Sequence, residues 1–154
     1  KKDLAAIITL LRDDPLGRSR EAAAPAGVDG YSAAFDDILA DDHSEMLVAD
    51  DNGEVCGCLM ISCLPGLSHQ GMRRLLVEDM RVAADLRRQG IGRALFAAAE
   101  ERARARGCGM IELFVHQERS GAHDFYRELG FTGSHLGFRK PLPGQRETPF
   151  RDQS

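Results

Sequence analysis

The feature that most constrains this chain is a short segment with two glycines and three arginines, Arg87–Arg93. An apolar, strand-like run, Leu75–Val82, precedes it. After it, apolar or small residues recur at the spacing of one helix face, namely Ile91, Ala94, Leu95, Ala98 and Ala99. The segment is therefore predicted to be the turn at which a strand gives way to a helix.

A turn of this kind can hold an anion. The first turn of a helix has backbone N–H groups without an internal partner, and the helix dipole makes that end positive. Gly90 and Gly92 leave the backbone open to a ligand, while Arg87, Arg88 and Arg93 add positive charge and forked donors. These residues predict a phosphate or pyrophosphate site. On these residues alone, a helix start with a solvated basic patch is the alternative.

Two common phosphate loops do not match this segment. The Walker pattern needs Gly-Lys-Ser/Thr, and no lysine follows these glycines. The dinucleotide fingerprint needs a third glycine, which is missing as well.

Hydrophobic periodicity and turn signals predict the other elements. Helices are predicted at Asp3–Leu11, Tyr31–Ala40, Gly90–Arg106 and Ser120–Leu129, and strands at Met46–Ala49, Glu54–Leu64, Arg73–Val82, Met110–Val115 and Ser134–Lys140. The turn Asp51-Asn52-Gly53 predicts a hairpin. We therefore predict an α/β (α+β) fold with a mixed sheet covered by helices, in one domain over 1–141 with a polar tail over 142–154.

Three landmarks together resemble the GNAT family of N-acetyltransferases. They are the Arg-x-x-Gly-x-Gly spacing of the turn, the strand Glu78–Val82 before it, and Phe125–Phe131, where an aromatic pair precedes Leu-Gly-Phe. The resemblance covers roughly Asp3–Lys140 and implies the family's fold, with splayed central strands. Two features depart from it. The usual first strand is not seen before the first helix, and Arg119 stands where many members have asparagine.

The resemblance implies acetyl-CoA as cosubstrate and no metal. Its pyrophosphate is expected on the turn, and its pantetheine arm on the backbone of the central strand. The Met80 or Arg81 N–H is expected to polarise the thioester carbonyl. The residues so assigned are Met80, Arg81, Val82, Arg87, Arg88, Gln89, Gly90, Ile91, Gly92, Arg93 and Phe125.

Two residues are assigned to catalysis. The resemblance implies that Tyr126 protonates the departing thiolate, and a core tyrosine bonded to a carbonyl is the alternative. Glu78 is the candidate base, with a salt bridge as the alternative. Strand alternation predicts that Glu78, Met80 and Val82 share a face and that Asp79 points away. His123 is a less favoured base.

The predicted function is acetyl-CoA-dependent transfer of an acetyl group to a primary amine of a small molecule, by direct attack in a ternary complex. A protein or peptide acetyltransferase and a coenzyme A-binding sensor without turnover are the alternatives. The resemblance places the amine between the first two helices and the C-terminal hairpin, where Tyr31 and Phe35 can lie.

Composition narrows the partners. The net charge of −4 argues against a dedicated nucleic-acid binder, and no apolar run approaches the roughly 18 residues of a membrane span. No secretory signal is visible, and the cysteines at 56, 58, 63 and 108 lack metal-ligand spacing. We expect buried free thiols in a cytoplasmic protein, with a homodimer as one possible assembly.

Overall fold

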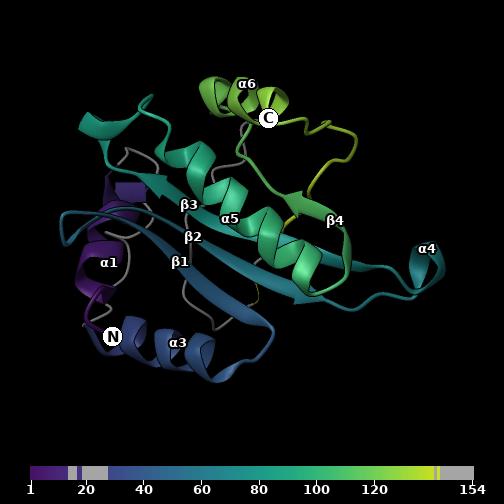
Figure 1. Cartoon of the computed structure of the whole chain (residues 1–154), viewed down its shortest axis with the longest axis horizontal. Coiled ribbons are helices and arrows are strands. Elements are labelled where there is room, and N and C mark those ends of the chain that lie inside the picture. Colours follow the sequence, from purple (N-terminus) through teal and green to yellow (C-terminus); the bar gives the residue numbers. More distant parts are fainter. Residues whose placement is uncertain (14–16, 19–27, 141, 143–154) are drawn as a thin grey trace.

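The computed structural model describes residues 1–13, 17–18, 28–140 and 142 (Figure 1). Except for residue 142, the predicted tail lies outside the described residues, so the domain end at 141 stays a prediction. Within the described part of the chain, no helix has the length and apolarity needed to cross a membrane.

The order of elements follows the prediction up to the last helix. The helices are α1 (Leu4–Arg12), α3 (Val28–Ala40), the single turn α4 (Ser68–Gly71), the 3-10 turn η1 (Ala84–Leu86), α5 (Ile91–Ala105) and α6 (Ser120–Glu128). The strands are β1 (Ser44–Asp51), β2 (Glu54–Leu64), β3 (Arg73–Val82) and β4 (Cys108–Leu113). Most predicted bounds agree to within two or three residues. Ser120 is the first residue of α6, whose cap position is Arg119, and not the cap itself.

The sheet is mixed, as predicted. Its order is β1-β2-β3-β4. β1–β2 and β2–β3 are antiparallel, and β3–β4 is parallel. The β1–β2 hairpin turns at Asn52 and Gly53, whose φ angles of 54° and 92° are the left-handed values that the sequence predicts there.

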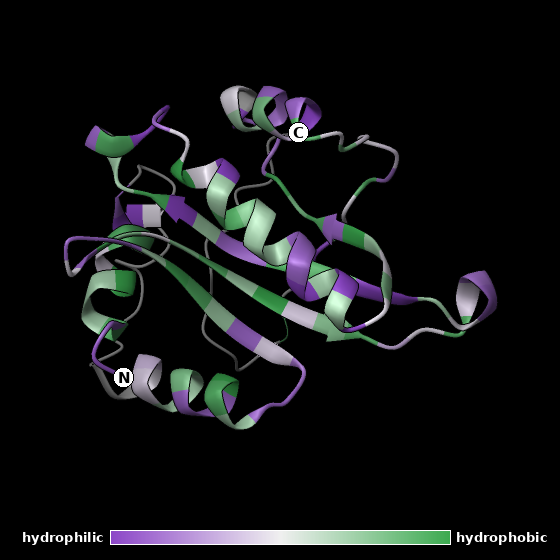
Figure 2. Ribbon diagram, viewed as in Figure 1, coloured by the Kyte–Doolittle hydropathy of each residue, from purple (hydrophilic) through white to green (hydrophobic). Residues whose placement is uncertain are grey.

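Helices cover both faces of the sheet (Figure 1). Alternate residues of β2 supply the two cores, because side chains along a strand point to opposite faces. Leu59 and Ile61 are fully buried in the cluster that contains Leu95 and Phe96 of α5. Cys58 packs instead in the second cluster, formed with Ile7, Leu10 and Phe35 of α1 and α3. Figure 2 shows α5 with both hydrophobic and hydrophilic stretches, as expected for an amphipathic helix over a sheet.

β3 carries a bulge at Asp79. Its register with β2 shifts between Cys58, which pairs with Arg81, and Met60, which pairs with Glu78. Asp79 has φ 51°, in the left-handed region. Two residues of β3 therefore stand opposite one residue of β2.

The bulge overturns the predicted alternation along β3. Val77, Met80 and Val82 all pack against the α5 cluster. Glu78 follows Val77 and so lies on the opposite face, which means that the predicted shared face of Glu78, Met80 and Val82 is wrong. Asp79 lines a cleft between α1 and α3, on the side that Glu78 faces, so its predicted opposite orientation is also wrong. The extra residue in the bulge shifts the alternation of side chains along β3 by one position.

β3 and β4 separate beyond the middle of β3. Their parallel ladder ends at the pair Val77–Leu113, whereas β3 stays paired with β2 as far as Val82. Among the residues that the structure describes, the edge of β3 beyond Val77 therefore has no strand partner, which confirms the splayed central strands that the resemblance implies.

The strand predicted at Ser134–Lys140 is wrong. Residues 131–140 form no helix or strand. β4 ends the sheet in the described part of the chain, so this segment has no ladder partner. Leu136 and Phe138 are accordingly 76% and 92% exposed. An extended segment becomes a strand only when another strand pairs with its backbone.

The cysteines lie mostly inside the two cores. Cys56, Cys58 and Cys63 are buried, Cys108 is half-buried, and all are free thiols. Burial raises the pKa of Cys58 to about 12. Burial, together with the Cys63 thiol 3.4 Å away, raises the pKa of Cys108 to about 11.

We predict that the denatured protein titrates with four free thiols. The native protein should react slowly with a thiol reagent at pH 7, because the thiolate is the reactive form and burial keeps Cys58 and Cys108 protonated. A thiol assay with and without denaturant measures both. Fewer than four thiols in denaturant without reductant would contradict the assignment.

Candidate active site

The turn after β3 has the predicted strand–turn–helix geometry. β3 ends at Val82, and α5 begins at Ile91 with Gly90 at the cap position. Gly90 has φ 90°, and a Cβ built on it would meet nothing within 4 Å. The first intrahelical bond runs from the Ala94 N–H to the Gly90 carbonyl. The preceding N–H groups of the first turn are therefore available to an anion.

Gly92 sits where two other predicted site residues meet. A Cβ on Gly92 would lie 3.0 Å from Met80 Cε and 3.1 Å from Phe125 Cζ. Both distances are tighter than ordinary side-chain contacts, so only glycine fits without a shift. The start of α5, the end of β3 and α6 are thus brought together at one point.

Asp13 fixes the start of the turn, which sequence reasoning missed. Its Oδ2 accepts from the Ala84 N–H at 2.9 Å and from Arg87 Nη2 at 3.4 Å. Arg87 Nε also donates to the Val82 carbonyl at 3.0 Å. No motif marks Asp13, because its role depends on the approach of α1 to a segment far away in the sequence.

The other polar side chains of the turn differ in whether they bind other residues of the protein. Arg93 pairs with Glu128 of α6, and Gln89 Nε2 donates to the Asp85 carbonyl at 3.2 Å. Arg88 has φ 65° and is exposed. Among the described residues, none forms an ion pair with Arg88, so its charge is available to a ligand.

The open edge of β3 presents two backbone amide groups. The Ala83 N–H bonds to the Cys56 carbonyl of β2 at 2.9 Å. Because backbone groups alternate between the two edges of a strand, those of Met80 and Val82 point to the edge that β4 has left. Arg81 Nη1 donates to the Met80 carbonyl there at 2.7 Å.

Tyr126 of α6 is held in an aromatic cluster that includes Phe96 of α5. Its ring centroid lies 5.7 Å from that of Phe96, 5.4 Å from that of Phe125 and 6.0 Å from that of Phe131. Burial raises the pKa of the phenol, while the charges of Arg81 and Arg119 act in the opposite direction. Within the described part of the chain, no hydrogen bond involves the Tyr126 hydroxyl. The described residues therefore give no support to the alternative in which Tyr126 is a core tyrosine that donates to a backbone carbonyl.

Glu78 is exposed, on the side of the sheet that carries α1 and α3. Burial raises the pKa of its carboxyl, as does the neighbouring Asp79, whereas Arg139 lowers it. No described residue forms an ion pair with Glu78 within salt-bridge distance. The other candidate base, His123, has its Nε2 3.1 Å from the His116 carbonyl.

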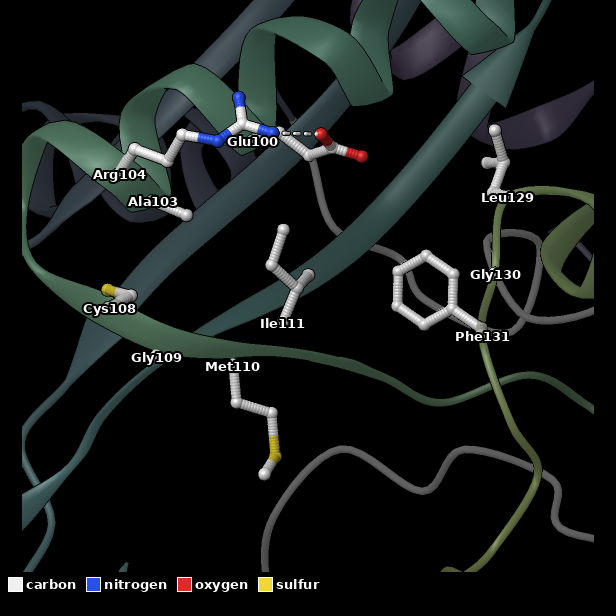
Figure 3. Close-up of a pocket in the computed structure, with 10 residues that line it drawn as sticks. All are labelled: Glu100, Ala103, Arg104, Cys108, Gly109, Met110, Ile111, Leu129, Gly130 and Phe131. Carbon is white, nitrogen blue, oxygen red and sulfur yellow. Dashed lines mark hydrogen bonds and ion pairs between the residues drawn. The ribbon is translucent and has the colours of Figure 1, made fainter.

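A cavity of about 320 Å³ lies elsewhere, between the C-terminal half of α5 and β4 (Figure 3). Ile111 and Phe131 line it, and the Arg104–Glu100 ion pair lies on its α5 side. This is the opposite end of α5 from Gly90. The cavity contains none of the predicted site residues.

Comparisons with known proteins agree with this geometry. The sequence profile described as the acetyltransferase (GNAT) family matches residues 5–131. An aminoalkylphosphonate N-acetyltransferase of Salmonella typhimurium is 34% identical over 114 residues, which span 74% of this chain and 71% of that protein.

Solved structures are similar as well. A transcriptional regulator from Bacillus halodurans has a TM-score of 0.86 and 38% identity, covering 92% of this chain and 95% of that one. A structure of AAC(6′)-Iy with the bisubstrate analogue CoA-S-monomethyl-acetylneamine has a TM-score of 0.74 and 20% identity, covering 92% and 94%. At 20% identity, the similarity to AAC(6′)-Iy shows a shared fold and nothing more.

The family profile spans most of the chain, and the glycine turn, the splayed strands and the aromatic cluster lie within it. The chain belongs to the acetyltransferase (GNAT) family and is an acyltransferase that uses acetyl-CoA.

Proposed function

We propose that this protein transfers the acetyl group of acetyl-CoA to a primary amine of a small molecule, by direct attack in a ternary complex. One observation carries the proposal: the edge of β3 that β4 leaves open meets the glycine turn, and Phe125, the neighbour of Tyr126 in α6, reaches the same point. A Cβ at Gly92 would contact Met80 of β3 and Phe125 of α6, so the turn, the end of β3 and α6 meet at this point.

The cofactor is held by backbone more than by charge. The N–H groups of the first turn of α5 and the exposed Arg88 face the pyrophosphate. The remaining turn residues, from Arg87 to Arg93, shape the loop around it. The Met80 and Val82 amides pair with the pantetheine arm, as an added strand pairs with a free edge. Of the two predicted N–H donors to the thioester carbonyl, that of Met80 faces the opening, whereas the ladder directs that of Arg81 toward β2.

The catalytic groups then have separate tasks. Glu78 takes a proton from the ammonium, directly or through water, and the free amine attacks the thioester carbonyl. Tyr126 donates to the coenzyme A sulfur as the thiolate leaves, since burial keeps the phenol protonated at neutral pH. An acetyl-cysteine intermediate is disfavoured, because the raised pKa of Cys58 leaves little thiolate.

A small-molecule acceptor is supported by the relative's name. The Salmonella typhimurium protein is an aminoalkylphosphonate N-acetyltransferase, and the chain spans 71% of its length. Incubation with acetyl-CoA, a set of small amines and a set of peptides, with release of free thiol as the signal, tests this. Turnover with peptides but with none of the small amines would replace the proposal by its peptide alternative.

The pH dependence of kcat/KM tests Glu78. A general base works when it is deprotonated. Because the pKa of Glu78 is raised, the acidic limb of the kcat/KM profile should lie at a higher pH than it would for an unperturbed carboxyl. Glu78→Gln should remove this limb and lower kcat/KM, with little change in acetyl-CoA affinity. Asp79→Asn should move the limb to lower pH, because it removes a charge that raises the Glu78 pKa.

Arg139→Gln supplies the opposite control, because the Arg139 charge lowers the Glu78 pKa. The limb should then move to higher pH. An unchanged profile in Glu78→Gln would return Glu78 to a structural role.

A further inference from the structure

We infer that the acceptor is an amine with a small apolar body, which lies in the cleft between α1 and α3 with its ammonium at Asp79. The inference rests on the proposed function and adds the class of amine.

The cleft has a volume of about 220 Å³, and its walls are mostly apolar, with Tyr31 and Asp79 as the polar side chains among the described residues that line it. Ile7, Ile8 and Leu11 of α1 form one wall, and Ala34 and Phe35 of α3 contribute to the other. These residues make the cleft suited to hydrocarbon, because an apolar ligand gains free energy on leaving water and a hydroxylated one loses hydrogen bonds.

Asp79 is the one charged side chain among the described residues that line this cleft. It is exposed, and within the described part of the chain its carboxylate has no ion pair or hydrogen bond. The bulge holds it there, with φ 51°. A lone carboxylate at an apolar cleft complements an ammonium on an apolar body, and it disfavours a substrate that carries an anion.

The cleft also leads to the reacting groups. Asp79 lies between Glu78 and Met80 in β3, so an ammonium bound to its carboxylate is next to the proposed base. It is also next to the residue whose N–H faces the opening between β3 and β4. Binding the ammonium at Asp79 therefore delivers the nitrogen to the point at which a proton must be removed and the thioester attacked.

The size of the cleft limits the body of the amine. A cavity of about 150 Å³ holds a benzene molecule. The cleft of about 220 Å³ therefore takes one ring or a short branched chain with its linker. 2-Phenylethylamine satisfies these conditions. Ethanolamine lacks the apolar body, and 2-aminoethylphosphonate adds an anion, so these two amines are the matched comparisons.

The test compares kcat/KM for the three amines at saturating acetyl-CoA with the full chain. We expect 2-phenylethylamine to exceed each of the other two by roughly 10- to 100-fold, the range for burying one aromatic side-chain-sized group. A preference for 2-aminoethylphosphonate or ethanolamine would overturn the inference while leaving the proposed function intact. Transfer to no amine, with acetyl-CoA bound, would overturn both.

Two variants on one helix locate the effect. Ala34→Phe fills the cleft, so KM for 2-phenylethylamine should rise at least 10-fold while that for ethanolamine changes little. Ala33 is exposed on the same helix but does not line the cleft, and Ala33→Phe should leave both constants unchanged. If Ala33→Phe and Ala34→Phe changed the KM for 2-phenylethylamine equally, the amine would not lie in this cleft. If Ala34→Phe does not fold, the ranking of the three amines in the unmodified chain decides.

Asp79→Asn tests the carboxylate. Asparagine tolerates the left-handed backbone, so the bulge should persist. We expect KM to rise roughly 10-fold or more for every amine, with an unchanged Kd for acetyl-CoA. An unchanged amine KM would show that Asp79 does not bind the ammonium.

Discussion

Replacing Tyr126 by phenylalanine is expected to lower kcat by roughly 10²- to 10⁴-fold, the usual contribution of a general acid. The substitution removes one hydroxyl and keeps the ring that packs against Phe96, Phe125 and Phe131. No described residue hydrogen-bonds that hydroxyl, so its loss should scarcely change folding. Steady-state kinetics and a thermal melt of the same preparation measure both effects.

A control separates chemistry from packing. Phe131→Leu removes a ring that contacts Tyr126 but retains the hydroxyl, so it should lower the melting temperature more than Tyr126→Phe and lower kcat less. If Tyr126 were a core residue with a structural hydrogen bond, Tyr126→Phe would cost about 1 kcal/mol of stability and leave kcat nearly intact. That outcome would remove the acid from the mechanism.

Replacing Gly90 by valine is expected to weaken acetyl-CoA binding by roughly 10- to 100-fold, the scale of one or two hydrogen bonds to a charged group. A valine at φ 90° strains the turn, and its side chain occupies the open space above the first N–H groups of α5. Calorimetry with acetyl-CoA measures the change in affinity.

Gly107 provides the matched control at the other end of α5. It also has a positive φ, 67°, and a Cβ on it would meet nothing within 4 Å. Gly107→Val should therefore lose a similar free energy of unfolding and keep its acetyl-CoA affinity. If both variants bind acetyl-CoA equally, the glycine turn does not hold the cofactor. Gly92 is unsuitable for this test, because its substitution also clashes with Met80 and Phe125.

Local signals predicted most of this fold. The periodicity after Gly90 gave the extent of α5, and Asn52-Gly53 gave the hairpin, because both depend on neighbours in sequence. The strand near Phe138 was predicted from the same local pattern and is absent, because a strand needs a partner that β4 does not supply. Pairing is a property of the whole sheet.

The site was predictable where it depends on backbone geometry and not where it depends on register. The glycine turn lies between β3 and α5, where the sequence predicts it, and Phe125 of α6 packs against its Gly92. Strict alternation misassigned the faces of Glu78 and Asp79, since nothing in the residues around Asp79 announces a bulge. An aspartate tolerates the left-handed backbone better than most residues, which is the one weak signal that was present.

The central claim is that the acetyl group passes directly from coenzyme A to the amine while both occupy the opening beside β3. Initial rates over a grid of acetyl-CoA and amine concentrations test it most directly. A ternary complex predicts double-reciprocal lines that intersect, with coenzyme A released only when amine is present. Parallel lines, together with a burst of thiol in the absence of amine, would indicate an acetyl-enzyme intermediate and contradict the claim.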